Sequence, residues 1–218
     1  MNNSAIILAG GFSKRFGQEK GLVLLDGKPL ILHVIEKIST LVNKCVVVVS
    51  SNTQGEKFNR VLPPESEIIV DFMDVRSPLV GALTGFKNIS SEYSLLLPCD
   101  TPFVSRSVIS LLLELCVNKA AVIPRWTNGY IEPLQAVYNV DLAKESAKKA
   151  LTEGSRDMCS MVEKMRGIRY VSTLVLRQLD PQLSTFFNIN TPIDLKKAEA
   201  ILKRQKRGEG ESLWKRWR

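Results

Sequence analysis

A glycine-rich, basic stretch near the start of the chain contains the residue types that hold phosphate. It reads LAGGFSKRFGQEK over residues 8–20, with Gly10 and Gly11 ahead of several basic side chains. Glycine has no Cβ, so backbone N–H groups can approach a phosphate closely. Arg15 offers a planar fork of donors, and Lys20 offers a mobile positive charge. We therefore expect this stretch to bind phosphate; the alternative is a glycine turn flanked by solvated lysines.

Two common phosphate-binding motifs do not match this stretch. A Walker A loop needs lysine directly after its last glycine, whereas Gly17 is followed by glutamine. The dinucleotide motif G-x-G-x-x-G needs a glycine two places after the first, and Phe12 stands there after Gly10. The stretch therefore belongs to neither class.

Asp100 is the second candidate for chemistry, because it ends the apolar segment SLLLPCD at residues 94–100. An ionised carboxylate at the rim of a sheet offers oxygens that only accept hydrogen bonds, and Mg²⁺ prefers oxygen ligands of this kind. The chain has four cysteines without a C-x-x-C pair and a single histidine, His33, which argues against zinc. Any metal should therefore be a hard cation bound by oxygen. The alternative for Asp100 is a turn or helix cap before Thr101.

The segments that must position these residues alternate between strands and helices. Short apolar runs predict strands at 5–8, 45–49, 68–70, 94–100, 120–124 and 132–138. Helical periodicity predicts helices at 29–42, 78–89 and 108–116, and a further helix from Pro192 capped by Thr191. This order predicts an α/β fold: a single Rossmann-like, three-layer α/β/α domain with a mostly parallel sheet.

Polar or glycine-rich loops follow the first four predicted strands. They read AGGFSKRFG, SSNTQ, DFMDVRSP and CDTPF, at residues 9–17, 50–54, 71–78 and 99–103. In parallel sheets, ligands collect at the carboxyl ends of the strands. We therefore expect these loops to form one site.

The amino-acid composition indicates a globular protein without a membrane-spanning segment. The 218 residues are 44% hydrophobic and 24% charged, which suits one globular domain. The longest apolar runs are too short to span a bilayer, and the polar start gives no sign of a signal peptide. We expect a cytoplasmic monomer without membrane contact.

The net charge of +8 is concentrated at the end of the chain. Residues 203–218 contain seven lysines or arginines and two glutamates, hence +5. We divide the chain into a catalytic domain at 1–202 and a basic, flexible tail at 203–218. The alternative is a tail that contacts RNA, anionic lipid or an acidic partner; we do not expect nucleic acid to be a partner.

The sequence also resembles a known family. Residues 8–31, LAGGFSKRFGQEKGLVLLDGKPLI, resemble the signature loop of the nucleotidyltransferases that activate sugars, lipids and cofactors. SPLVGALTGF at 77–86 and LLLPCDTPFV at 95–104 are similar to the molybdenum cofactor guanylyltransferases in particular. EPLQAVY at 132–138 and NINTPIDL at 188–195 extend the resemblance, which covers residues 5 to about 200. It implies the nucleotide-diphospho-sugar transferase-like variant of the fold.

The resemblance implies a reaction and roles for the first loop. GMP would pass from GTP to the terminal phosphate of molybdopterin, releasing pyrophosphate and needing no nucleophilic side chain. The phosphate-contacting positions of the family fall on Arg15 and Lys20, and Asp100 would bind an Mg²⁺ that bridges the triphosphate. The backbone segment that grips base and phosphates corresponds to the residues Leu8, Ala9, Gly10 and Gly11.

Other site residues are also implied by the resemblance. Asp71 matches an acidic position that contacts the nucleoside, with Asp74 as a nearby alternative. Ser50 stands in the nucleotide-binding region where the family often has asparagine, which weakens the inference of base selectivity. Asn188 and Asn190 match paired asparagines at the reacting centre; the alternative is that they are turn and cap residues of the last helix.

The second substrate is expected near residues 132–138 and 153–158. Arg125, Arg156 and Lys164 are candidates for its phosphate, and the sequence does not distinguish them. GTP and molybdopterin are the expected substrates, and other molybdenum cofactor proteins are possible partners. Two alternatives stay open. The first is a related nucleotidyltransferase that transfers a cytidylyl group to molybdopterin, or that uses a cobamide or a sugar phosphate as the acceptor. The second is a nucleotide-binding or RNA-associated accessory protein that uses its basic tail.

Overall fold

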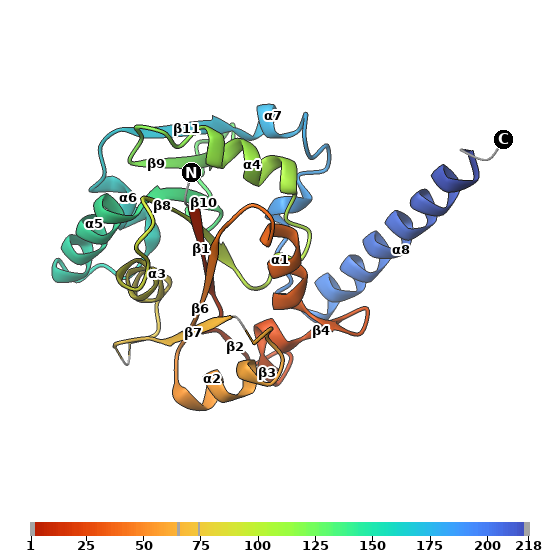
Figure 1. The fold of residues 1–218 in the computed structure, drawn as a ribbon, viewed down its shortest axis with the longest axis horizontal. Coiled ribbons are helices and arrows are strands. Elements are labelled where there is room, and N and C mark those ends of the chain that lie inside the picture. Colours follow the sequence, from red (N-terminus) through yellow and green to blue (C-terminus); the bar gives the residue numbers. More distant parts are fainter. Residues whose placement is uncertain (1–2, 65, 74, 216–218) are drawn as a thin grey trace.

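The computed structural model describes residues 3–64, 66–73 and 75–215, the last ten of them by backbone only. Its centre is a seven-stranded sheet in the order β11-β9-β10-β8-β1-β6-β7 (Figure 1). The pairs are parallel except that β10 is antiparallel to both β8 and β9. The strands are β1 (Asn3–Leu8), β6 (Lys44–Val49), β7 (Glu67–Val70), β8 (Tyr93–Pro98), β9 (Ala121–Arg125), β10 (Ala136–Asn139) and β11 (Ile168–Ser172).

Helices cover both faces of this sheet (Figure 1). One face carries α1 (Leu30–Ile38), α2 (Asn52–Asn59), α4 (Arg106–Glu114) and α7 (Thr173–Leu176). The other carries α3 (Pro78–Lys87), α5 (Val140–Thr152) and α6 (Met158–Glu163). The predicted three-layer, mostly parallel α/β/α architecture is therefore confirmed.

Successive side chains of the central strands pack alternately under the two helical layers. Ile7 and Val47 are fully buried under the layer of α1 and α4, whereas Ile6 and Val46 are fully buried under the layer of α3 and α5. Successive side chains of a strand point to opposite faces, so a strand covered on both sides is apolar throughout. This is why the apolar runs predicted the central strands correctly.

Two small hairpins extend the carboxyl edge of the sheet beside β1. They are formed by β2 (Phe12–Ser13) with β3 (Gln18–Glu19), and by β4 (Leu24–Leu25) with β5 (Lys28–Pro29). Between them lies the 3₁₀ helix η1 (Lys20–Leu22), and a second one, η2 (Ser184–Phe186), lies near the end of the domain. The sequence pattern did not predict these short elements.

Two predicted element boundaries were wrong by four residues, whereas the other observed boundaries lie within one or two residues of the predicted ones. The helix expected over 29–42 ends at Ile38, because the chain turns there to enter β6. The strand expected over 132–138 begins only at Ala136, because residues 132–135 form a turn in which Gln135 N donates to Glu132 O at 3.2 Å.

The last helix, α8 (Pro192–Lys215), points away from the sheet (Figure 1). Thr191 and Asp194 cap its start: Asp194 N donates to Thr191 Oγ1 at 3.1 Å, and Thr191 N donates to Asp194 Oδ2 at 2.9 Å. Ala198 packs into a small cluster with Leu30 and Phe103. The helical backbone continues past residue 202; residues 216–218 lie outside the described part of the chain, and the flexible tail stays a prediction.

No helix in the described part of the chain combines the length and apolar character needed to cross a membrane.

Candidate functional site

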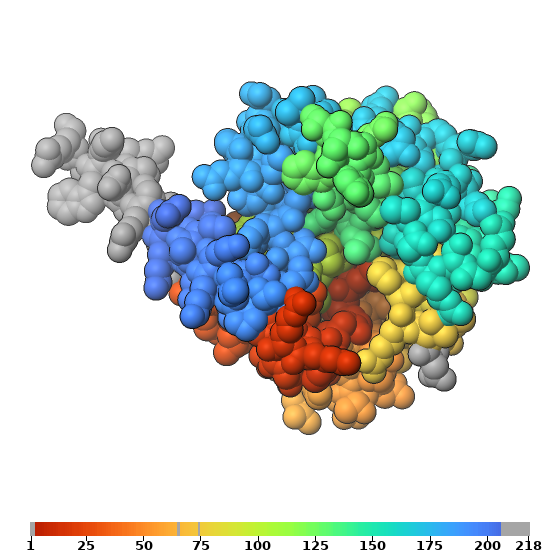
Figure 2. Space-filling view, turned by 180° about the vertical axis from the view of Figure 1, so that it is seen from behind, coloured from red at the N-terminus to blue at the C-terminus, as the bar shows by residue number. Residues whose placement is uncertain are grey.

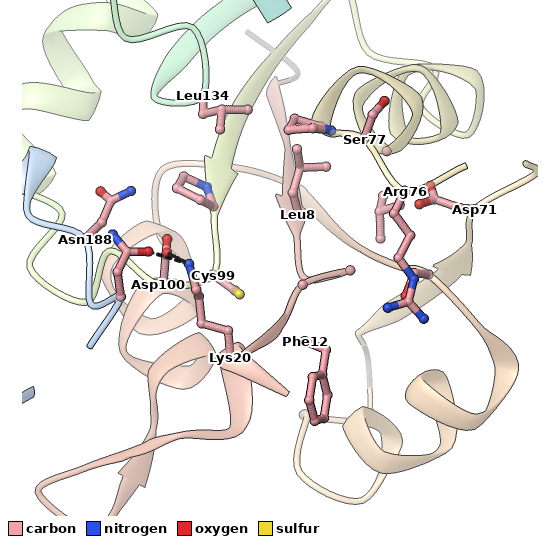
Figure 3. Close-up of a pocket in the computed structure, with 18 residues that line it drawn as sticks. Leu8, Phe12, Lys20, Asp71, Arg76, Ser77, Cys99, Asp100, Leu134 and Asn188 are labelled. Carbon is pink, nitrogen blue, oxygen red and sulfur yellow. Dashed lines mark hydrogen bonds and ion pairs between the residues drawn. The ribbon is translucent and has the colours of Figure 1, made fainter. Parts of the chain in front are cut away.

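A cavity of about 450 Å³ lies at the carboxyl ends of β1, β6 and β8 (Figure 3). In the space-filling view the surface is hollowed between the red N-terminal segment and the yellow segment near residue 75 (Figure 2). Its lining residues are Leu8, Gly10, Gly11, Phe12, Lys20, Val48, Ser50, Asp71, Arg76, Ser77, Pro78, Gly81, Pro98, Cys99, Asp100, Leu134, Asn188 and Asn190. The four loops predicted to meet at this edge of the sheet therefore do meet.

Lys20 connects two segments that are far apart in the sequence. Its Nζ donates to Asp100 Oδ2 at 2.7 Å and to Asn190 Oδ1 at 2.6 Å. Figure 3 shows these contacts on one side of the cavity, with Asp71, Arg76 and Ser77 on the other. Charge-assisted hydrogen bonds of this kind fix the positions of both partners.

Gly21 explains how Lys20 comes so close to the end of β8. A Cβ at Gly21 would lie 2.9 Å from Phe58 Cε1 and 3.2 Å from Cys99 Sγ. Only a residue without a side chain therefore lets η1 pack against this corner of the sheet. Lys20 N also donates to Gly11 O at 3.1 Å, which joins η1 to the glycine-rich loop.

Asp100 is buried and only half satisfied. Its Oδ2 is paired with Lys20, but its Oδ1 is buried and has no hydrogen-bond partner among the described residues. A buried carboxylate oxygen without a donor is costly in free energy, and a bound cation would remove this cost. The turn after Asp100 is held by other atoms, since Thr101 Oγ1 donates to Pro98 O at 3.1 Å.

The backbone of Asp100 also positions the two asparagines. Ile189 N donates to Asp100 O at 3.0 Å, and the side chain of Ile189 is fully buried. Asn188 and Asn190 flank this anchored residue, and both line the cavity. Asn190 N additionally donates to Asp194 Oδ2 at 3.2 Å at the start of α8, so a capping contact and a place in the cavity occur together.

Gln54 holds the glycine-rich loop against the end of β6. Its Oε1 accepts from Ser50 N at 2.7 Å and from Ser50 Oγ at 3.0 Å, and its Nε2 donates to Ala9 O at 2.9 Å. The same Nε2 donates to Glu19 Oε2 at 2.8 Å. The sequence analysis missed Gln54, which lies in the first turn of α2; the available signal was a long polar side chain in the polar segment that follows a buried strand.

Asp71 lines the cavity on the side away from Lys20 and Asp100 (Figure 3). Its N donates to Val49 O at 2.8 Å, whereas its Oδ1 is buried without a partner in the described chain. Burial raises the pKa of the Asp71 carboxyl, and the nearby Thr84 hydroxyl opposes this rise. The competing residue, Asp74, lies outside the described residues.

Two predicted residues are not among those that line the cavity. The side chain of Ala9 packs in the core of the domain, and only its carbonyl reaches the loop contact with Gln54. Arg15 is exposed between β2 and β3 and does not line the cavity. Conversely, Phe12 and Arg76 line it and were not predicted, although Arg76 lies in the polar loop that follows β7.

A second cavity of about 480 Å³ adjoins the first. Both are lined by the residues Ser77, Pro78, Leu134 and Asn188. Of the three basic candidates for the second substrate, only Arg156 lines it. Lys164 instead pairs with Glu153, and the Arg125 guanidinium lies 5.3 Å from the ring centre of Tyr170.

A cavity at the carboxyl ends of a parallel sheet, with a lysine, an unpaired carboxylate oxygen and two amides, has the groups that suit the nucleotidyltransferase class. The chain belongs to the MobA-like NTP transferase domain family, whose model matches residues 5–167.

Similar proteins agree with this assignment. The chain is 36% identical to a probable molybdenum cofactor guanylyltransferase of Methanosarcina mazei, with 88% of each chain covered. It is 34% identical to the molybdenum cofactor guanylyltransferase of Desulfosudis oleivorans, covering 92% of this chain and 96% of that one. Among solved structures, molybdopterin-guanine dinucleotide biosynthesis protein A from Archaeoglobus fulgidus is similar with a TM-score of 0.79 and 32% identity, covering 92% and 99% of the two chains.

Proposed function

We propose that this protein transfers GMP from GTP to the terminal phosphate of molybdopterin, yielding a guanine dinucleotide cofactor and pyrophosphate. The observation that carries the proposal is the meeting of Lys20, Asp100 and Asn190 in one cavity of about 450 Å³. The guanylyltransferase names of relatives that match most of this chain support the choice of substrates.

The proposed reaction needs positioning and charge stabilisation from the protein. A phosphate oxygen of molybdopterin forms a bond to the α-phosphorus of GTP, and the bond from that phosphorus to the bridging oxygen breaks, so pyrophosphate leaves. Lys20 then stabilises negative charge on the phosphates, and Asn188 and Asn190 orient them through neutral amides. Because the substrate supplies the nucleophile, no nucleophilic side chain is required.

The donors at this place fit a magnesium ion. Asp100 Oδ1 is a buried carboxylate oxygen without a partner in the described chain, and Asn188, whose side chain has an amide oxygen, lines the same cavity. The described residues contain no group of three or more His, Cys, Asp or Glu side chains that could hold a metal, so phosphates and water would supply the remaining ligands. Bound Mg²⁺ would neutralise charge on the triphosphate.

The second cavity supports an acceptor site beside the nucleotide. It shares four lining residues with the first, and Arg156 supplies a positive charge for the phosphate of molybdopterin. The side chain of Arg156 has no hydrogen bond or ion pair within the described chain, so its guanidinium is available to a ligand.

Pyrophosphate release tests the proposal. Purified protein is incubated with molybdopterin, Mg²⁺ and each of GTP, CTP, ATP and UTP in turn. We expect release with GTP and little with the others. A preference for CTP would support a cytidylyltransferase. If pyrophosphate is released only when a cobamide or a sugar phosphate is supplied in place of molybdopterin, that compound is the acceptor.

Deletion of residues 203–218 separates an enzyme from a tail-dependent binding protein. An enzyme of the proposed kind keeps its GMP transfer, because the residues described as lining the two cavities all precede residue 203. Loss of nucleotide affinity on deletion would support the accessory-protein alternative instead.

A further inference from the structure

The second cavity contains a carboxylate whose position is fixed from one side. Trp126 Nε1 donates to Glu132 Oε1 at 2.6 Å, and the Trp126 ring packs edge-on against Phe186 with 5.6 Å between ring centres. Glu132 N donates to Pro124 O at 2.9 Å, which anchors the backbone to β9. Glu132 therefore lines the cavity with a defined orientation.

The other oxygen of this carboxylate is free. Glu132 Oε2 has no hydrogen bond or ion pair in the described chain, and it is not among the buried unpaired atoms, so it is accessible. Each carboxylate oxygen has two lone pairs, so Oε1 also keeps one acceptor position beside Trp126. Glu132 can therefore accept two parallel hydrogen bonds from a ligand.

The other carboxylate of the cavity is already engaged. Asp157 begins α6, where its Oδ1 accepts from Ser160 N at 2.9 Å and its Oδ2 accepts from Ser160 Oγ at 2.7 Å. These bonds hold the pKa of Asp157 below its ordinary value. Glu132 and Arg156 are thus the charged groups of the lining that remain open to a ligand. A molecule with neighbouring N–H donors at one end and an anion at another would satisfy both.

We propose that Glu132 binds the aminopyrimidinone edge of the acceptor's pterin ring, through the ring N–H and the exocyclic amino group. This inference rests on the proposed function, which makes a phosphorylated pterin the acceptor. Guanine has the same pair of donors, but Glu132 lies in the cavity that adjoins the cluster of Lys20 and Asp100 and does not line the nucleotide cavity itself. The carboxylate thus selects the acceptor ring, and Arg156 binds its phosphate end.

Glu132→Gln tests the proposal by steady-state kinetics. Glutamine can still accept from Trp126, but its amide presents donors toward the donor edge of the ligand. Hydrogen bonds to a charged group are worth enough that we expect a rise of roughly 10-fold to 100-fold in KM for molybdopterin. KM for GTP should stay within about twofold. An unchanged KM for molybdopterin, or a raised KM for GTP alone, would overturn the inference.

A binding measurement without turnover separates recognition from a structural role. The probes are 6-hydroxymethylpterin and 6-hydroxymethyllumazine, which has a carbonyl in place of the amino group, titrated by their fluorescence in the presence of GTP. The unmodified protein should prefer the pterin, and Glu132→Gln should lose this preference, because glutamine can donate to the added carbonyl. Equal affinities for the two rings, or a preference unchanged in the variant, would contradict the role of Glu132. A protein that keeps the preference but transfers no GMP would overturn the proposed function alone.

Discussion

Lys20 Nζ lies 2.7 Å from Asp100 Oδ2, although 80 residues separate the two in the sequence. Lys20 begins η1 after the glycine-rich loop, and Asp100 follows the end of β8. Because β1 and β8 are parallel neighbours in the sheet, their carboxyl ends lie at the same edge. This pair therefore joins the end of the glycine-rich loop to the expected metal ligand.

Replacement of Lys20 by alanine should lower kcat by at least about 100-fold, the usual loss when one electrostatic stabiliser of a transition state is removed. The far-ultraviolet circular dichroism should stay unchanged, because the Lys20 side chain is partly exposed and its hydrogen bonds go to other side chains of the cavity. Lys14→Ala is the matched control: it removes a lysine from the same loop, but its side chain is exposed and outside the cavity. Near-normal turnover of Lys20→Ala would remove this residue from the mechanism.

Asp100→Asn should weaken the response to magnesium. The variant keeps the size of the side chain but loses the charge on the buried, unpaired Oδ1. We expect the Mg²⁺ concentration for half-maximal activity to rise and kcat to fall by about 100-fold or more. The measurement is a Mg²⁺ titration of pyrophosphate release, with Asp141→Asn on the exposed start of α5 as control. An unaltered Mg²⁺ dependence would rule out Asp100 as the ligand.

Asp71→Asn should raise the free energy of unfolding and lower the affinity for GTP. Burial raises the pKa of this carboxyl in the folded protein, so the folded state holds the proton more tightly than the unfolded state does. The free energy of unfolding contributed by Asp71 therefore falls as pH rises from about 4 through the raised pKa.

The asparagine variant lacks this titration. Its gain in unfolding free energy over the unmodified protein should grow from pH 4 to pH 8, as measured by urea unfolding without ligand. Its affinity for GTP should fall in calorimetry. A stability difference that is constant with pH would contradict the assigned pKa shift.

Gly21→Ala should destabilise the fold by roughly 1–3 kcal/mol, the usual range for overpacking a filled site. The added Cβ would lie 2.9 Å from Phe58 Cε1 and push η1 away from the sheet. Gly11→Ala is the control for stability, since a Cβ there meets nothing within 4 Å. Urea unfolding of both variants measures the difference, and equal midpoints would show that η1 does not need this close contact.

Much of the fold could be predicted because its central strands are covered on both faces. Val46 to Val49 are all buried, so they appear as an uninterrupted apolar run. The position of the site could also be predicted, because polar loops follow four strands and these loops lie at the same edge of a parallel sheet. The helix α2 was missed because its sequence, NTQGEKFN, lacks an apolar periodicity; it is set by the cap of Ser51 and by the packing of Phe58.

The orientation of individual side chains could not be predicted in the same way. Arg15 and Lys20 both follow the glycines, but the hairpin of β2 and β3 leaves Arg15 exposed while η1 directs Lys20 to Asp100. Glu132 was expected within a strand, where its side chain would alternate with its neighbours. The turn at 132–135 instead places it in the second cavity. Both outcomes depend on local turns whose residues carry no periodic signal.

The most direct test of the central claim follows the α-phosphate of GTP. GTP labelled at the α-phosphate, and separately at the γ-phosphate, is incubated with the protein, Mg²⁺ and molybdopterin, and the products are separated by chromatography. The account predicts that the α-label enters the pterin dinucleotide and that the γ-label leaves as pyrophosphate. An α-label that never joins the pterin, or a γ-label released as orthophosphate, would contradict it.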